Sequence, residues 1–240
     1  MEKPESMKKV ILLFVACITL SSCAELQSIA SQLPQSGALS QADIGNGLRQ
    51  ALDKGVTQEV TKLSATDGFF KNEAVKIFLP QELQDVDSGL RKIGLGSVAD
   101  EGLKLLNRAA EEATKEALPI FVDAVKDITF ADAKNILLGD QRAATSYLES
   151  KTQQSLYDKF SPVIDKNLGE VGATKLWTDA ITRYNSIPLL NDVNPDLRDY
   201  VTQKALQGVF TMIAQEEIQI RESVNARTTD LLRRVFALQD

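Results

Sequence analysis

Residues 40–63 read SQADIGNGLRQALDKGVTQEVTKL, and the order of these side chains decides the fold class. Ser40 and Asp43 stand three apart at the start, a variant of the capping box with aspartate in place of glutamate. The apolar residues after them recur at spacings of three and four, which places them on one face of a helix. They are Ile44, Leu48, Leu52, Val56, Val60 and Leu63. The stretch predicts an amphipathic helix that opens a folded domain near Ser40.

The chain beyond residue 63 keeps this helical pattern, and no stretch shows the alternation typical of a strand. Glycine, proline and capping residues divide it into segments. We expect helices over 69–79, stopped by Pro80; over 80–93; from Ser97 through 125, broken near its end by Pro119; from Thr129, closed by Gly139; from Asp140 through 160; over 174–184; over 196–222; and over 226–237. The sequence predicts an all-α fold, one compact bundle of about eight to ten helices. A division into two layers near Gly94 is the alternative.

The first 23 residues have the order of a bacterial lipoprotein signal. Lysines at 8 and 9, an apolar run over 10–20 and serines at 21 and 22 precede Cys23. The apolar run is shorter than the about 20 residues that a membrane-spanning helix needs. The order resembles a lipobox, which implies cleavage before Cys23 and acylation of its sulfur, with palmitate among the acyl chains. An ordinary secretory signal and a buried apolar helix are the alternatives.

This resemblance implies three parts: a cleaved signal over 1–22, the lipidated Cys23 with a tether over 23–39, and a helical domain over 40–240. Translation starts at Met1 or at Met7. An aspartate directly after the cysteine tends to retain lipoproteins in the inner membrane, and here Ala24 stands there. We therefore expect a protein held by its lipid at the outer membrane, facing the periplasm.

Composition narrows the chemistry that is open to the chain. It contains no histidine, and its two cysteines are Cys17, inside the apolar run, and Cys23. Histidine-based nucleophile systems and histidine-ligated metals are excluded, no phosphate-binding glycine motif is present, and no cofactor or metal is expected. The net charge of −6 argues against a nucleic-acid partner, because such binding depends on neutralising phosphates.

Two polar groups have the spacing of catalytic or metal-binding residues. Asp132 with Lys134 would place an acid beside a cation, but a threonine three residues earlier favours a helix cap. Glu216, Glu217 and Arg221 share one helix, where Glu217 and Arg221 stand four apart and favour an ion pair. A di-iron site of the helical-bundle type is disfavoured because it needs histidine.

Two further groups suit a ligand or a partner. Trp177, Tyr184 and Asn185 would line a pocket, although packing of the aromatic rings in the core is the favoured interpretation. Arg227 begins a cationic stretch at the last helix, which would bind an anion or an acidic protein surface. Capping by the neighbouring threonines and pairing with carboxylates are favoured there.

Several segments of the C-terminal half are distinctive. They are ITFADAK (128–134), AATSY (143–147), GATK (172–175), YN (184–185), DYVTQKAL (199–206), EE (216–217) and ARTTDLL (226–232). Together they resemble an uncharacterised bacterial family, domain of unknown function number 4197, and residues 40–51 fit its N-terminal part. The resemblance implies an exported, often lipid-anchored helical domain without an established activity, cofactor or catalytic residue. It adds Tyr147, Lys175 and Lys204 to the candidate site residues.

Three hypotheses about function follow. The leading one is a non-enzymatic, lipid-anchored module that binds an envelope protein or an apolar small molecule. The second is a histidine-independent enzyme, which requires some of Asp132, Lys134, Tyr184 and Glu216 to lie together within hydrogen-bond reach. The third is a purely structural envelope protein, which a well-formed cleft with converging polar groups would argue against.

Overall fold

The computed structural model describes residues 39–80, 84, 88, 91, 92, 94, 96–186, 188, 192 and 196–238. The predicted signal peptide, Cys23 and nearly all of the tether lie outside the described residues. The same holds for most of the helix that we predicted over 80–93.

Eight α-helices and one short 3-10 helix make up the described part of the chain, in which no strand occurs. Their bounds are α3 Gln41–Ser64, α5 Gly96–Thr114, α6 Ala117–Lys126, α7 Phe130–Leu137, α8 Ala143–Glu170, α9 Ala173–Asn185, α10 Leu197–Glu222, η2 Val224–Ala226 and α11 Asp230–Phe236. The prediction of an all-α bundle is confirmed.

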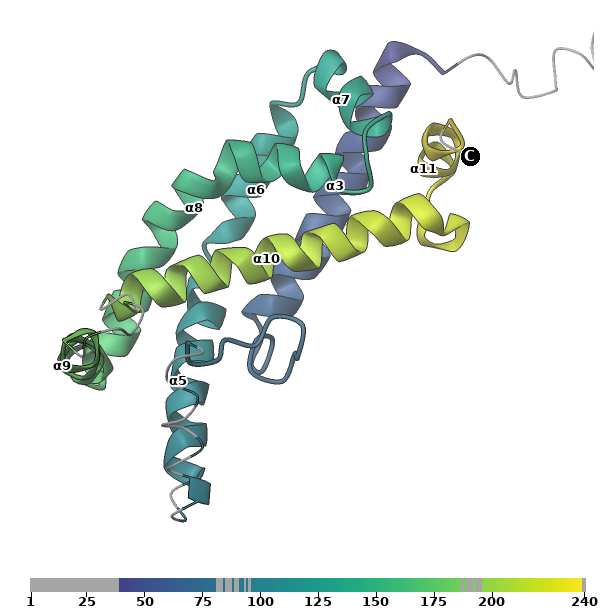
Figure 1. Cartoon of the computed structure of the whole chain (residues 1–240). Helices are drawn as coiled ribbons and strands as arrows, with labels where there is room; N and C mark the ends of the chain where they lie inside the picture. Colours follow the sequence, from purple (N-terminus) through teal and green to yellow (C-terminus); the bar gives the residue numbers. More distant parts are fainter. Residues whose placement is uncertain are drawn as a thin grey trace, which may run out of the picture. The chain divides into compact units, whose positions relative to one another are not determined.

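The two longest helices of the described part, α8 and α10, organise the packing. The chain runs along α8, turns through α9 and returns as α10 against α8 (Figure 1). Helix α3 packs against α6, α7, α10 and α11, while α5 packs on α8. Phe121 of α6 and Phe210 of α10 meet edge to face, with ring centroids 5.9 Å apart, in a hydrophobic core to which all eight helices contribute.

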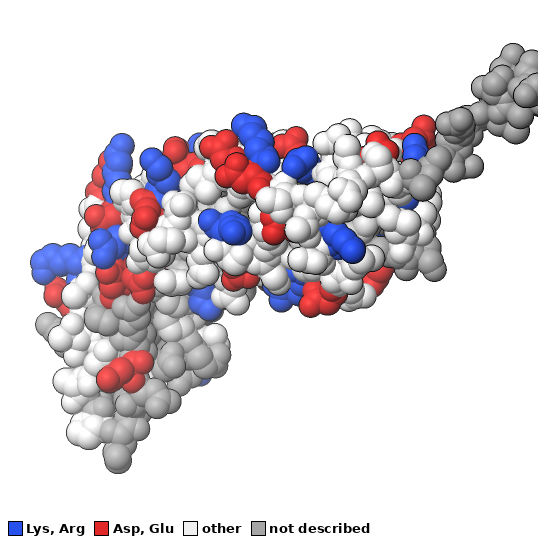
Figure 2. Space-filling view, turned by 90° about the horizontal axis from the view of Figure 1, so that it is seen from above, with Lys and Arg blue, Asp and Glu red and all other residues white. Residues whose placement is uncertain are grey.

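The helix lengths and the surface charge of the described part bear on contact with a membrane. None of the helices in the described part is long and apolar enough to cross a membrane. On the face drawn in Figure 2, basic and acidic side chains are interspersed, and neither sign gathers into a broad patch. That face therefore offers no extended electrostatic surface of one sign.

Both predicted capping boxes are confirmed. The Asp43 N–H donates to Ser40 Oγ at 3.1 Å, and the Ser40 N–H donates back to the Asp43 carboxylate at 3.0 Å. Thr129 and Asp132 form the same reciprocal pair at the start of α7. In each case two side chains three positions apart satisfy N–H groups that a helix start leaves free.

The predicted helix over 69–79 is wrong, because this segment forms turns and irregular backbone. The buried carboxylate of Glu111 in α5 accepts the N–H groups of Asp67, Phe69 and Phe70 at 3.1 to 3.2 Å. The side-chain amide of Asn107 in α5 also takes the Ile77 N–H at 2.8 Å, which a helix over 69–79 would direct to the carbonyl of residue 73. Asp67 also has φ of 70°, a left-handed conformation in which α3 cannot continue.

The long helix predicted from Ser97 through residue 125 is two helices. Helix α5 ends at Thr114 and α6 begins at Ala117, so the break precedes Pro119 instead of following it. Pro119 lies in the first turn of α6, where a missing N–H costs nothing because the first-turn N–H groups have no helical acceptor. Ser97 is the second residue of α5 and not its cap.

The helix predicted from Asp140 starts later and runs further than expected. Helix α8 begins at Ala143, and Asp140 Oδ1 accepts the Arg142 N–H at 2.8 Å in the turn before it. It continues past residue 160 and through Pro162 to Glu170. Glycine at 172, with φ of 70°, then makes the predicted turn into α9.

The last helix was predicted over 226–237, but the chain makes a 3-10 turn first and α11 spans only Asp230–Phe236. Thr229 is its N-cap and accepts the Leu232 N–H at 3.2 Å. The delay has a physical cause in Arg227, whose side chain bonds to the end of α10 and holds the backbone out of a helix.

Candidate functional site

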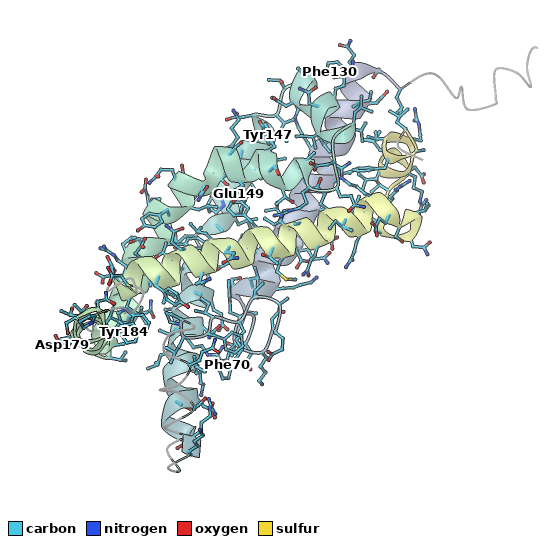
Figure 3. The ribbon with its side chains drawn as sticks, in the orientation of Figure 1. Phe70, Phe130, Tyr147, Glu149, Asp179 and Tyr184 are labelled. Atoms are coloured by element: carbon cyan, nitrogen blue, oxygen red, sulfur yellow. The ribbon has the colours of Figure 1, made fainter. Side chains whose placement is uncertain are left out.

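The residues singled out from the sequence do not form one site. They are Asp132 and Lys134 on α7; Tyr147 on α8; Lys175, Trp177, Tyr184 and Asn185 on α9; Lys204, Glu216, Glu217 and Arg221 on α10; and Arg227 after η2. Figure 3 shows Tyr147 and Tyr184 in separate parts of the domain. Asp132, Lys134, Tyr184 and Glu216 lie on three different helices, and no hydrogen bond of the described residues joins any two of them. The arrangement that the enzyme hypothesis requires is absent from the described part.

Asp132 is a helix cap. Its carboxylate accepts the Thr129 N–H at 3.0 Å and the Thr129 hydroxyl at 2.6 Å. These hydrogen bonds from Thr129 hold the pKa of Asp132 below its ordinary value. Lys134 is exposed on the same helix. The favoured interpretation of this pair, a cap, is confirmed.

Tyr147 of α8 is close enough to this cap to respond to its charge. Burial raises the pKa of the Tyr147 hydroxyl, and the carboxylates of Asp132 and Asp127 raise it further. The Lys151 ammonium lies 5.7 Å from the centre of the ring. The tyrosine is thus a neutral, partly buried side chain at the surface of α8.

Replacing Asp132 by asparagine is expected to make stability less sensitive to acid. The pKa of folded Asp132 lies below 3.8, so the carboxylate contributes stability above that pH and loses it as pH falls through the lowered value. Urea unfolding of both proteins from neutral to acidic pH measures the difference. The two free energies of unfolding should converge in acid, and a constant gap would contradict the cap.

Glu217 and Arg221 form a buried clip between α7, α8 and α10. The Glu217 carboxylate accepts the N–H groups of Ala144 and Thr145 at 2.9 and 2.8 Å, and the Thr145 hydroxyl at 2.8 Å. Arg221 lies 2.8 Å from that carboxylate and donates to the last carbonyls of α7 at 2.8 and 3.3 Å. The predicted ion pair is confirmed, and it satisfies free groups at two helix ends.

Arg227 is also structural, since its side chain is almost completely buried. Its guanidinium donates to the carbonyls of Ile220 and Arg221 at 3.1 and 2.8 Å and lies 5.8 Å from the Phe236 ring. It therefore closes the C-terminal end of α10 and contributes no cation to the surface. Glu216 is half-buried on the face of α10 that approaches Gly55 of α3.

Helix α9 contributes core residues and a surface ion pair. Tyr184 is half-buried and packs against the core, and Asn185 is half-buried at the end of the helix. Lys175 is exposed and lies 2.9 Å from Asp179, which raises the pKa of the lysine.

Trp177 has a different structural role, because through Tyr200 it links α9 to a segment that is far away in sequence. Its ring is buried and stacks on Tyr200 of α10, with centroids 5.7 Å apart and planes 23° from parallel. The Tyr200 hydroxyl donates to the Phe78 carbonyl at 2.7 Å. The core interpretation of Trp177 is confirmed, and the stack positions Tyr200 against the segment after α3.

A surface cleft of about 490 Å³ lies between that segment and α10, and we term it the Lys204 cleft. Residues 74–80 line one side, and Tyr200, Lys204, Gln207, Gly208 and Thr211 line the other. Ligand sites in proteins range from about 300 to 1,000 Å³. The Lys204 cleft is therefore large enough for a small molecule or a short segment of peptide.

Two lysines give the cleft a positive charge. Lys204 is exposed, and its ammonium lies 6.0 Å from the Tyr200 ring and 3.4 Å from Gln207 Oε1. The Lys76 side chain is only 19% exposed, and its ammonium lies 4.9 Å and 5.4 Å from the rings of Phe70 and Phe78. One exposed cation and one held against two aromatic rings thus belong to the same cleft.

Buried polar groups of α5 hold the segment that lines the cleft. Asn107, completely buried, accepts the Ile77 N–H at 2.8 Å and donates to the Ile77 carbonyl at 2.9 Å. Glu111 anchors the turn before it, and Arg108 bridges Glu111 to Asp67. The irregular segment is therefore fixed by specific hydrogen bonds, as a binding site requires.

At Gly208, helix α10 approaches this segment so closely that a side chain would not fit. An added Cβ would lie 2.6 Å from Cε1 of the buried Phe69 ring, so Gly208→Ala should lower the free energy of unfolding by about 1 to 3 kcal/mol. Gly102→Ala is the matched control, because nothing lies within 4 Å of a Cβ there. Chemical denaturation measures both, and an equal effect of the two would contradict the close packing.

Sequence reasoning found Lys204 but missed the rest of this site. A signal was present in α5, where Asn107 and Glu111 stand four apart on the face that also carries Leu103, Leu106 and Ala110. Polar residues on an apolar helix face must find buried partners. Their partners are backbone groups of the misassigned segment, which the sequence pattern does not identify.

No group of three or more acidic, cysteine or histidine side chains within the described ranges is arranged to hold a metal ion.

A family model described as protein of unknown function (DUF4197) matches residues 38–237. No match was found among curated proteins, and none among solved structures.

Proposed function

Because the chain belongs to the family of proteins of unknown function DUF4197, which specifies no activity, we propose from the geometry that it is a lipid-anchored binding module of the bacterial cell envelope. Its ligand occupies the Lys204 cleft. The observation that supports this proposal most is a cleft of about 490 Å³ in which cationic side chains from two separate segments lie beside an apolar wall.

The construction of the cleft supports binding more than a purely structural role. Tyr200, oriented by Trp177, bonds to the Phe78 carbonyl, and Asn107 fixes the neighbouring residue from the other side. Groups that are rigid before a ligand arrives lose less entropy on binding. Phe78 nevertheless remains 45% exposed, which is unusual for a phenylalanine and leaves apolar area for a ligand.

The sequence supports the anchor. The apolar run, the small residues before Cys23 and the absence of any other cysteine beyond residue 22 fit lipidation at that sulfur. Two or more acyl chains hold a protein firmly, since each buried methylene contributes about 0.8 kcal/mol. The module would then act where the membrane and the periplasm meet.

Cys23→Ser is expected to release the protein from membranes without unfolding it. The substitution removes the lipid attachment atom, and the hydrophobic core of the described part is formed by residues after position 38. Fractionation of cells after a high-salt wash measures the attachment to membranes, and circular dichroism of the purified variant measures whether the domain is folded. A variant that stays with the membrane fraction would contradict the lipid anchor.

Native mass spectrometry of the full-length protein, extracted from its own membranes in mild detergent, tests the binding module. We expect a bound species that Lys204→Glu removes and that Lys159→Glu, an exposed charge reversal on α8, retains. Equal retention by both variants, or a protein that carries nothing, would overturn the proposal.

A further inference from the structure

The backbone at Ile77 is arranged like a residue of a strand. Its N–H and its C=O bond to the same side-chain amide, that of Asn107, at 2.8 and 2.9 Å. Both groups must therefore point to the same side, as they do in extended backbone. Asn107 takes the place of a neighbouring strand on the side of α5.

In extended backbone the groups of the preceding and following residues point the opposite way. The Phe78 carbonyl confirms this direction, because it accepts the hydroxyl of Tyr200, which lines the Lys204 cleft. By the same alternation, the Lys76 C=O and the Phe78 N–H face that side as well. Neither takes part in a hydrogen bond in the described part of the chain.

We propose that the Lys204 cleft binds an extended peptide segment, which adds to residues 76–78 as a strand and carries a carboxylate held by Lys204. This inference rests on the proposed function and names its ligand class. One residue of the peptide donates its N–H to the Lys76 carbonyl and accepts the Phe78 N–H, the spacing of a parallel ladder.

Charge and shape favour the same ligand. Lys204 is the exposed cation of the cleft, while Lys76 is held between two rings and lies 3.7 Å from Glu73. The carboxylate comes from the C-terminus of the peptide or from an acidic side chain. An acyl chain would fit the apolar wall of Phe78, but it would leave the Lys76 C=O and the Phe78 N–H without partners.

The experiment uses the purified full-length chain and a fluorescein-labelled octapeptide library with every residue type at each of the last four positions. Each peptide is made with a free and with an amidated C-terminus, and with glutamine in place of each acidic residue. The tightest binder is then N-methylated at one backbone amide at a time. Fluorescence anisotropy gives the dissociation constants.

Strand addition predicts that N-methylation weakens binding about tenfold at the one amide that donates to the Lys76 carbonyl and little at the amides on either side of it, since one lost hydrogen bond of this kind is worth about a factor of ten. Loss of the carboxylate and Lys204→Gln should each weaken it several-fold, without adding when combined, while Lys159→Gln has no effect. Amidation and the glutamine replacement distinguish the two sources of the carboxylate.

Uniform sensitivity to N-methylation, binding that Lys204→Gln leaves unchanged, or no peptide that binds would each overturn the inference. Displacement of the probe by palmitate or a lysophospholipid, with no single peptide amide that is sensitive to N-methylation, would also overturn it. A bound species that depends on Lys204 in native mass spectrometry would survive these failures, so the proposed function and the peptide assignment fail separately.

Discussion

Glu217→Ala is expected to lower the free energy of unfolding by about 3 to 5 kcal/mol, the range for breaking a buried ion pair from one side. The carboxylate is 6% exposed and receives two backbone N–H groups, a hydroxyl and a guanidinium. Its removal leaves Arg221 buried beside carbonyls alone and uncovers the start of α8. Urea unfolding followed by circular dichroism measures the loss.

Gln215→Ala is the matched control, because this side chain is exposed on the same helix and its removal should change stability by less than about 0.5 kcal/mol. In a double-mutant cycle, Arg221→Ala added to Glu217→Ala should cost much less than either change alone. Additive losses would show that the two residues act independently, which would contradict the clip.

Glu111→Ala should cost a similar amount, about 3 to 5 kcal/mol, and should also alter the Lys204 cleft. Three backbone N–H groups converge on this carboxylate, which is 5% exposed, and Arg108 joins it to Asp67. Without the carboxylate these N–H groups lose their partner, and the first part of the segment over 65–80 is then held to α5 only through Asn107 and Ile77. Hydrogen exchange by mass spectrometry should show faster exchange over that segment.

The neighbouring Glu112→Ala provides the control, since Glu112 is 49% exposed and pairs only with Lys115 at the surface. We expect a change below about 0.5 kcal/mol and unaltered exchange over 65–80. If Glu111→Ala left the exchange of residues 67–70 unchanged, Glu111 would not be the group that holds the segment.

The helices that were placed well are those whose ends are decided by adjacent residues. The capping boxes at Ser40 and Thr129 and the left-handed Gly172 act within a few positions, so sequence alone identifies them. The start of α10 was also placed within one residue, where Asp196 accepts the Asp199 N–H at 3.0 Å. Local patterns therefore gave the fold class and most boundaries.

The boundaries that were misplaced depend on side chains from elsewhere in the chain. Glu111 takes the N–H groups of a segment about 40 residues before it, and Glu217 takes those at the start of α8 from more than 70 residues away. Arg227 holds its own backbone out of a helix by bonding to α10. A sequence pattern contains no information about which distant carboxylate will approach which backbone.

The same limit applied to the candidate site. Asp132 has a conspicuous local spacing because it is part of a helix cap. The local spacing of Glu217 reflects its ion pair with Arg221, and its backbone partners on α8 come from far away in sequence. Lys204 has no such pattern on its helix. Its significance comes from residues 74–80, which reach α10 only in the folded domain.

The central claim is that the Lys204 cleft is a binding site, and photo-crosslinking in intact cells tests it most directly. p-Benzoylphenylalanine would replace Thr211, which lines the cleft, or Lys159, which is exposed on α8. The proposed function predicts a defined adduct from position 211 that falls at least about tenfold with Lys204→Glu, and none from position 159. Equal yields from both positions, or an adduct at 211 that Lys204→Glu leaves unchanged, would contradict it.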